Sequence, residues 1–262
     1  MSETDYKVAI VSGGATLIGQ KIVEAFRARG DKVVIADINV SDGEAFASGF
    51  DDSVIFQLTD ITVDSQIDAC ITRTLEAFDR LDYLVNVACT YLDSGAASTR
   101  EEWLTALDVN VVGAMIFTQK AQVEMQNRGG GAVVNFGSIA AKRAQPGRML
   151  YATSKAAILG MTRCQALAFA DTGVRVNSVS PGWTWSNIIR DLSSNNRTKA
   201  DAVAEPFHLA GRLVDAEEVA ATVVYLCSDA ASGINGTDIA VDGGYTAIGP
   251  EQKTDKVSKL TE

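Results

Sequence analysis

Short apolar runs alternate with longer amphipathic stretches along almost all of this 262-residue chain. The first two runs are KVAIVSG at 7–13 and KVVIAD at 32–37. Between them lies LIGQKIVEAFRARG at 17–30, which has the apolar spacing of a helix that ends on a glycine. Apolar runs of this length, bounded by glycine or proline and separated by helices, indicate strands of a parallel sheet covered on both faces.

Five further apolar runs bring the predicted strands to seven, at 53–60, 81–88, 131–138, 174–182 and 236–244. The later helices are predicted at 65–80, 101–129 (one long helix or two), 151–173 and 216–228. One continuous alternation predicts a single α/β domain of the doubly wound Rossmann type, with about seven parallel strands and helices on both faces. We assign this domain to 1–245 and a polar tail, either disordered or an arm on a neighbouring subunit, to 246–262.

Charge and composition exclude several classes of partner. A net charge of −10 and a pI near 4.7 argue against nucleic acid or an anionic membrane surface. No apolar run is long enough to span a membrane, and the N-terminus MSETDYK lacks the pattern of a signal peptide. The four cysteines have no metal-ligand spacing, so we expect reduced thiols, a cytoplasmic protein and no metal site.

A glycine-containing turn, SGGATLIG at 12–19, joins the first strand to the first helix. Glycines there let the backbone approach a pyrophosphate, although a turn that only packs a helix on a strand could look the same. Asp37 ends the second strand, where a carboxylate would bind ribose hydroxyls and repel a 2′-phosphate. We therefore predict NAD rather than NADP. Asp60, which ends the third strand, either meets the adenine edge or caps the next helix.

Tyr151 and Lys155 are four residues apart in a predicted helix, so they share a face and the ammonium can lie beside the phenol. A nearby cation favours phenolate and would lower the pKa of the tyrosine towards the working pH. Such a tyrosine suits general acid/base chemistry on an alcohol–carbonyl pair, and Ser138 could hydrogen-bond the same oxygen. Taken alone, the pair fits a surface helix equally well.

The single histidine, His208, lies in a polar stretch. A zinc site or a Ser-His-Asp triad would have to be built around it, and no G-x-S-x-G motif accompanies any serine. We expect a loop residue, with contact to a substrate as the alternative.

With these motifs in order, nearly the whole chain resembles the short-chain dehydrogenase/reductase family, in its NAD-dependent subtype of about 250 residues. The resemblance rests on the turn at 12–19, Asp37, Asp60, the segment from Asn86 to Ala88, Asn110 within DVN, Ser138, Tyr151, Lys155, Pro181-Gly182 and VDGG at 241–244.

The resemblance implies a role for each catalytic position. Tyr151 would exchange a proton with the substrate hydroxyl, and Lys155 would lower its pKa and hold the nicotinamide ribose. Ser138 would orient the substrate oxygen, and Asn110 would position a water that relays protons through Lys155. Hydride would pass between the substrate carbon and the nicotinamide. The implied cofactor contacts are Gly13, Thr16, Leu17, Ile18, Gly19, Asp37, Asp60, Ile61, Asn86, Ala88, Tyr151, Lys155, Pro181, Gly182 and Thr184.

Two segments depart from the family pattern. Leu17 stands at the position of the middle glycine of the turn, and the family's N-N-A-G reads Asn86-Val87-Ala88-Cys89. Leucine costs little backbone strain if position 17 is already helical, although its side chain could crowd a pyrophosphate. We interpret both as variation within the family.

The family places substrate specificity after the sixth strand, where 183–212 has the length and polarity of a mobile lid. Aromatic side chains here and after the fourth strand predict a pocket with aromatic walls. The expected substrate contacts are Tyr91, Ala140, Gln145, Arg148, Trp183, Trp185, Phe207 and His208.

An NAD-preferring site suits oxidation of an alicyclic or aryl secondary alcohol or a dihydrodiol. A sugar or polyol is the alternative substrate, and a non-catalytic dinucleotide-binding protein is the alternative class. The family also implies a homotetramer, or a homodimer, formed through helices near 101–128 and 151–171 and the last helix and strand.

Overall fold

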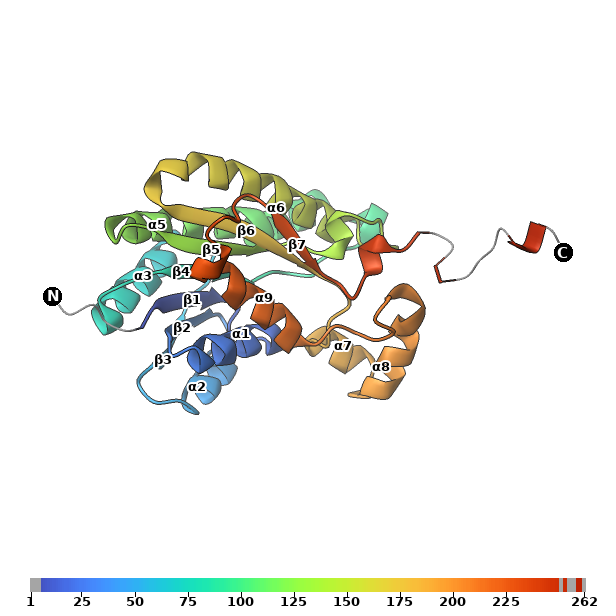
Figure 1. The fold of residues 1–262 in the computed structure, drawn as a ribbon, viewed down its shortest axis with the longest axis horizontal. Coiled ribbons are helices and arrows are strands. Elements are labelled where there is room, and N and C mark those ends of the chain that lie inside the picture. Colours follow the sequence, from blue (N-terminus) through green and yellow to red (C-terminus); the bar gives the residue numbers. More distant parts are fainter. Residues whose placement is uncertain (1–5, 250–251, 254–257, 261–262) are drawn as a thin grey trace.

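A single parallel sheet forms the centre of the computed structural model, which describes residues 6–249, 252–253 and 258–260. Its seven strands lie in the order β3-β2-β1-β4-β5-β6-β7, and every neighbouring pair is parallel (Figure 1). The seven predicted strands are confirmed. They are β1 (Val8–Ser12), β2 (Lys32–Asp37), β3 (Val54–Leu58), β4 (Tyr83–Asn86), β5 (Gly131–Phe136), β6 (Val174–Pro181) and β7 (Asp238–Val241).

Helices cover both faces of the sheet, as predicted (Figure 1). Alternate residues of β1 point to opposite faces: Ala9 and Val11 belong to one core, and Val8 and Ile10 to the other. The first core is covered by α1 (Leu17–Ala28), α2 (Val40–Ala47) and α9 (Ala216–Leu226), and the second by α3 (Asp64–Phe78), α5 (Ala114–Asn127) and α6 (Met149–Ala168).

The long helix predicted at 101–129 is two helices joined by a π-helical turn. The turn, Asp108–Gly113, connects α4 (Arg100–Leu107) to α5. A Cβ at Gly113 would lie 2.7 Å from the Ile61 carbonyl oxygen, so a glycine is needed where the turn meets the loop after β3. Such π-helical turns in α-helices often mark functional sites. Here the turn carries Asn110, which is 2% exposed.

The segment predicted to be a lid is largely helical. It contains α7 (Asn187–Leu192), α8 (Arg197–Ala204) and a 3₁₀ turn, Glu205–Phe207. A small separate core of Ala200, Ala204 and Leu213 lies beneath it, with Trp183, Trp185 and Ile189 packed against that core. Sequence analysis placed no helix here, because each is short and this core takes residues from both ends of the segment.

Part of the predicted tail lies outside the described residues. Of its described part, the Thr246 carbonyl accepts a hydrogen bond from Arg143, and Lys253 donates to the Glu205 carbonyl. No helix in the described part of the chain is long and apolar enough to cross a membrane.

Candidate active site

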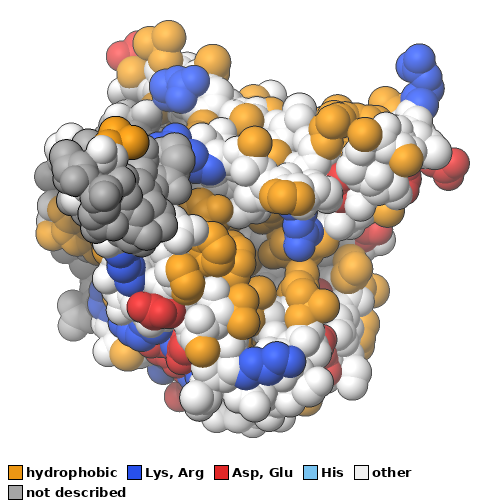
Figure 2. Space-filling model, turned by 90° about the vertical axis from the view of Figure 1, so that its right-hand side faces the viewer, with side chains coloured by type: hydrophobic (Ala, Val, Ile, Leu, Met, Phe, Trp, Pro, Cys, Tyr) orange, Lys and Arg blue, Asp and Glu red, His pale blue; other side chains and the backbone are white. Residues whose placement is uncertain are grey.

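The carboxyl ends of β1, β4, β5 and β6 meet at one edge of the sheet, where α7 and α8 also lie (Figure 1). Figure 2 looks onto this edge and shows hydrophobic side chains around a hollow, with lysine and arginine side chains near its rim. Ligands of open parallel sheets bind at such edges. Most of the predicted site residues follow these strands.

The turn after β1 begins the helix α1. Gly13 has a φ of +71°, and a Cβ there would lie 2.7 Å from the Ala88 amide nitrogen, so only glycine fits. Thr16 caps the helix: its hydroxyl donates to the Gly13 carbonyl and accepts from the Gly19 amide. A Cβ at Gly19 would collide with the Gly13 carbonyl. The result is a compact turn that presents the N-terminus of α1 at the edge.

Leu17 is the first residue of α1, so its backbone is helical and the glycine of the family pattern is not needed for a left-handed conformation. Its amide donates a 2.8 Å hydrogen bond to Asn187 Oδ1 of α7. Asn187 was not predicted as a site residue, since nothing in the sequence pairs two positions so far apart. Because Asn187 Oδ1 accepts this hydrogen bond, the N-terminus of α1 has room for an oxygen acceptor.

Asp37 lies at the end of β2 and is 8% exposed. One carboxylate oxygen accepts a hydrogen bond from the Ala15 amide of the turn, and the other accepts from the Asn39 amide. The carboxylate is therefore held beside the glycine turn, where an acidic group would disfavour a 2′-phosphate.

Two predicted cofactor contacts lie near the ends of β3 and β4: Asp60 follows β3, and Asn86 is the last residue of β4. Asp60 binds the Thr62 amide and hydroxyl, while Val63 is the N-cap of α3, so the prediction that Asp60 caps this helix is wrong. The Asn86 side chain points into the core and donates to Asn135 and Thr118. Its Oδ1 is buried and has no hydrogen-bond partner in the described part of the chain.

Of the other predicted cofactor contacts, some lie at the carboxyl ends of the strands and others lie in the hydrophobic cores that flank the sheet. Ile18 and Ile61 pack in the two hydrophobic cores. The Ala88 amide donates to the Ser12 carbonyl, which holds the loop after β4 against β1. After β6, Pro181 and Gly182 reach the edge, and a Cβ on Gly182 would lie 2.7 Å from Asp242 Cα. Thr184 is 5% exposed and donates to the Gly182 carbonyl.

Tyr151, Lys155 and Ser138 come together as predicted. Tyr151 and Lys155 share a face of α6, with the Lys155 ammonium 5.7 Å from the centre of the Tyr151 ring. Lys155 is 3% exposed and donates a 2.9 Å hydrogen bond to the Phe136 carbonyl at the end of β5. Ser138, two residues further on, accepts a hydrogen bond from the Ala140 amide, and its side chain lies close enough to Tyr151 to lower the pKa of the phenol.

Lys155 lowers the pKa of Tyr151, as predicted, but the net shift of this pKa is in the opposite direction. Burial raises the pKa above its ordinary value, and the charge of Lys155 and contacts with Ser138 and Tyr91 only partly oppose it. Burial disfavours the charged form of a phenol, and this effect exceeds that of the ammonium here.

The Asn110 side chain joins two segments of the site, while its positioning of a water stays a prediction. Its side chain accepts from the Thr90 amide at 2.7 Å and donates to the Thr90 carbonyl and to the Ser154 hydroxyl. Ser154 in turn donates to the Tyr151 carbonyl. Asn110 therefore ties the loop after β4 to the helix that carries Tyr151.

Two residues of this arrangement were missed by sequence analysis. Asp93 accepts a 2.8 Å hydrogen bond from the Tyr151 amide and another from the Gly95 amide. It satisfies an N-terminal amide of α6 from a distant loop. Ser154 was missed because a serine inside a helix carries no signal of its own; only Asn110, 44 positions away, gives it a role.

The predicted substrate contacts lie in two places. Tyr91 stacks on Tyr151, with ring centroids 5.1 Å apart and 17° between the planes. The Arg148 guanidinium lies 6.0 Å and 5.8 Å from the two ring centroids and forms no ion pair with the described residues. Ala140 is buried beside Ser138. These residues surround the Tyr151 side chain.

The second group of predicted substrate contacts forms an aromatic wall, which takes its residues from the two ends of the segment 183–212 that contains α7 and α8. Trp183 packs on Phe207 and His208, and His208 packs on Tyr245. Gln145 donates a 3.4 Å hydrogen bond to the Tyr245 hydroxyl, and a cavity of about 290 Å³ opens beside Phe207 and Tyr245.

Two of the predicted substrate contacts, His208 and Trp185, pack against other residues of the protein. His208 lies in a loop, as expected, but it is completely buried, and its Nδ1 pairs with the Ala204 carbonyl. Trp185 packs on the small core under α7 and α8, with Arg197 over its ring. Both side chains support the segment 183–212 in this structure.

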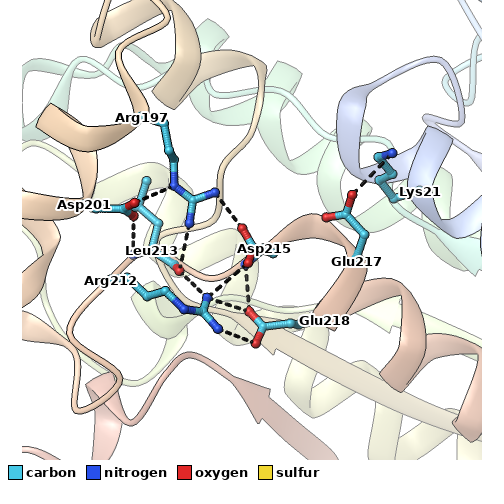
Figure 3. Close-up of polar contacts among 8 residues, drawn as sticks. All are labelled: Lys21, Arg197, Asp201, Arg212, Leu213, Asp215, Glu217 and Glu218. Atoms are coloured by element: carbon cyan, nitrogen blue, oxygen red, sulfur yellow. Dashed lines mark hydrogen bonds and ion pairs between the residues drawn. The ribbon is translucent and has the colours of Figure 1, made fainter.

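An ion-pair network fastens the segment 183–212 to the start of α9 (Figure 3). Arg197 of α8 binds Asp201 and Asp215, and Arg212 binds Asp215 and Glu218. Asp215 and Glu218 also form a capping box for α9. The segment is therefore anchored to the outer layer of helices at its C-terminal end.

Comparisons with known proteins agree with this geometry. A family model described as enoyl-(acyl carrier protein) reductase matches residues 13–246. The 2,5-dichloro-2,5-cyclohexadiene-1,4-diol dehydrogenase of Sphingobium indicum is 34% identical over 256 residues, 95% of this chain and 100% of that protein. The D-threitol dehydrogenase of Mycolicibacterium smegmatis is 32% identical over 248 residues, 92% of this chain and 94% of that protein.

Among solved structures, a 7α-hydroxysteroid dehydrogenase complexed with NADH and 7-oxo glycochenodeoxycholic acid superimposes with a TM-score of 0.84. It is 26% identical to this chain, and the match covers 91% of this chain and 93% of that one.

The ion-pair network predicts a pH-dependent contribution to stability. The hydrogen bond from Arg212 lowers the pKa of Glu218 below its ordinary value of 4.5. The Glu218–Arg212 pair therefore stabilises the folded protein fully above about pH 4.5, and this stabilisation is lost as the pH falls through the folded-state pKa of Glu218. Glu218→Gln should lower the free energy of unfolding by up to about 1 kcal/mol near pH 7, a small value because the pair is partly exposed. Urea unfolding should show this difference disappearing once the pH lies below the folded-state pKa of Glu218.

The matched control is Glu76→Gln, at an exposed position of α3 that forms no ion pair with the described residues. A difference for Glu218→Gln that persists unchanged in acid would show that the carboxylate charge is not responsible.

Proposed function

The chain belongs to the short-chain dehydrogenase/reductase family and is an oxidoreductase of alcohols or polyols, and we propose that it uses NAD to oxidise an alicyclic or aryl secondary alcohol or a dihydrodiol. The observation that carries the proposal is the meeting of Tyr151, Lys155 and Ser138 at the sheet edge where the glycine turn also lies. The cyclohexadiene-diol relative favours a ring substrate, and the threitol relative keeps a polyol as the second candidate.

The chain has the groups that an NAD molecule needs. The N-terminus of α1 would hold the pyrophosphate, because its Leu17 amide already faces an oxygen acceptor, Asn187 Oδ1. The Asp37 carboxylate would hold the adenosine ribose, and Lys155 the nicotinamide ribose. Asp60 would lie near the adenine, and Pro181, Gly182 and Thr184 near the nicotinamide. When bound, the nicotinamide supplies the acceptor for the hydride that leaves the substrate carbon.

Residues of the protein position the substrate hydroxyl and accept its proton. Ser138 orients the substrate oxygen towards Tyr151, and the Tyr151 phenolate takes the hydroxyl proton as the alcohol becomes a carbonyl. Because burial opposes the phenolate, the adjacent Lys155 charge is needed to make it accessible. Asn110 keeps Tyr151 in place through Ser154, and α7 and α8 form the lid that excludes water.

The substrate would lie between the Tyr91–Tyr151 pair and the aromatic wall of Trp183 and Phe207. Arg148, which has no ion-pair partner among the described residues, is free to bind a polar or anionic substituent. We place the protein in the cytoplasm, on its composition and its free cysteines.

Tyr151→Phe tests the assigned base. The variant keeps the ring and its stacking but loses the hydroxyl, so NAD affinity measured by calorimetry should stay within about twofold of the wild type. NADH formation from a secondary alcohol should fall by about 10²-fold or more, because proton transfer loses its acceptor. Retention of most of the activity would refute the role given to Tyr151.

Asp37→Asn tests the choice of cofactor. The amide keeps an oxygen for the Ala15 amide but removes the negative charge, so the preference of kcat/KM for NAD over NADP should fall about tenfold or more. Asp52→Asn, at an exposed position after α2, is the control and should leave the preference as it was. An unchanged preference in Asp37→Asn would mean that the adenosine ribose binds elsewhere.

We also propose that the protein is a homotetramer, with a homodimer as the alternative. The helical layer of α4, α5 and α6 exposes three large apolar side chains in the described part of the chain, Leu104 (63%), Val123 (50%) and Leu167 (79%). Light scattering should give a mass of four chains, or two, and a monomer at micromolar concentration would contradict the proposal.

A further inference from the structure

One hydrogen bond joins the lid to the helix that is assigned to the pyrophosphate. Leu17 is the first residue of α1, and Asn187 is the first residue of α7, within the segment 183–212. The Leu17 amide nitrogen and Asn187 Oδ1 lie 2.8 Å apart, although the two residues are 170 positions apart in the chain. A side chain of the lid therefore occupies a main-chain donor at the N-terminus of α1.

Two amides at this N-terminus already have acceptors within the protein. The amides of the first turn of an α-helix have no partners inside the helix. Here the Thr16 hydroxyl accepts from the Gly19 amide, and Asn187 accepts from the Leu17 amide. A phosphate bound at a helix N-terminus accepts hydrogen bonds from these same amides. Because an amide has a single hydrogen, the Asn187 oxygen and a pyrophosphate oxygen are alternative partners of Leu17.

The helix α7 is otherwise attached weakly. None of its six residues is buried. Among the described residues, the Asn187 side chain forms the only hydrogen bond from α7 to a part of the chain outside 183–212. The ion pair between Arg190 and Asp191 lies within the helix, and Ile189 packs against the small core under the segment. Loss of the Asn187 contact therefore leaves only side-chain packing to hold α7.

The rest of the segment is anchored, so movement would be confined to α7. The ion-pair network of Figure 3 fastens α8 and the residues that follow it to the start of α9. Between α7 and α8, Ser194 and Asn195 have φ of 54° and 59°. This left-handed conformation is uncommon in residues other than glycine, and it ends α7 before α8 begins. The two helices are separate units, and α7 is the one without an ion pair to the rest of the described chain.

We propose that Asn187 competes with the pyrophosphate of NAD for the Leu17 amide and so couples cofactor binding to the position of α7. The proposal rests on the proposed binding of NAD at the N-terminus of α1. In the free protein the Asn187 side chain fastens α7 to α1. When the pyrophosphate takes the Leu17 amide, this attachment is lost and α7 is released before the substrate enters. No covalent bond changes, and only the acceptor of one hydrogen bond is exchanged.

Calorimetric titration with NAD, without any substrate, tests the competition. Asn187→Ala removes the competing oxygen, so the Kd of NAD should fall about three- to tenfold, the effect of one hydrogen bond. Asn187→Asp places a carboxylate there, which binds the Leu17 amide more strongly and repels the pyrophosphate, so the Kd should rise about tenfold or more. Opposite signs identify competition, because a residue that binds NAD, or only supports the fold, would weaken binding in both variants.

The matched control is Asn196→Ala. Asn196 lies in the same segment, and its side chain accepts a 2.9 Å hydrogen bond from the Lys199 amide at the start of α8. The control thus removes the same kind of hydrogen bond from the lid without touching Leu17. Its Kd for NAD should stay within about twofold of the wild type, because the two sites share no partner.

Hydrogen exchange of the α7 amides is a second readout that needs no turnover. In the free protein these amides should exchange about three- to tenfold faster in Asn187→Ala than in the wild type, because α7 has lost its attachment. Saturating NAD should remove this difference, since the wild type then loses the same contact.

Unchanged exchange of α7 in Asn187→Ala, or a Kd that does not fall, would overturn the proposal. The two failures are distinguishable. If the wild type binds NAD and Asn187→Ala does not bind it more tightly, only the competition is refuted. If the wild type does not bind NAD at all, the proposed function fails and the competition fails with it.

Discussion

The Asn110 side chain is the point on which the geometry of the site depends. It binds both main-chain groups of Thr90 after β4 and the Ser154 hydroxyl on α6, and it is 2% exposed. These hydrogen bonds are buried or partly buried, so loss of the side chain would leave several polar groups without partners. The π-helical turn Asp108–Gly113 is what brings Asn110 into this position.

This arrangement sets up a conflict between burial and charge at Tyr151. Enclosure protects the reacting groups from water, yet it raises the pKa of a phenol that must give up its proton to act as a base. The protein opposes this effect from several elements at once, with the Lys155 ammonium on α6, the Ser138 hydroxyl after β5 and the Tyr91 hydroxyl after β4. Lys155 is itself buried, and the Phe136 carbonyl gives it a hydrogen-bond partner.

The sheet and its covering helices could be predicted in detail, and so could the residues that gather at the sheet edge. All seven strands were found within a few residues, because hydrophobic alternation is a local signal and glycine or proline marks the boundaries. The meeting of Tyr151 and Lys155 follows from helical spacing alone, and that of Ser138 from the position of a strand end. Helical backbone at Leu17 also follows from local pattern.

Several features that depend on a partner distant in sequence were not predicted. The helices α7 and α8, the burial of His208 and the inward turn of the Asn86 side chain each depend on residues from other segments. Asp93, Ser154 and Asn187 escaped notice for the same reason, since each is an ordinary polar residue until its partner is known.

Local sequence was therefore sufficient for the fold, the order of the elements and the identity of the acid/base pair, because periodicity and short spacings act within one strand or helix. Only the tertiary structure decided the direction of the Tyr151 pKa, the task of Asn110 and the pairing of Tyr91 with Tyr151. Burial and electrostatic interaction depend on everything that surrounds a group, and the groups that shift the pKa of Tyr151 come from separate stretches of chain brought together by folding.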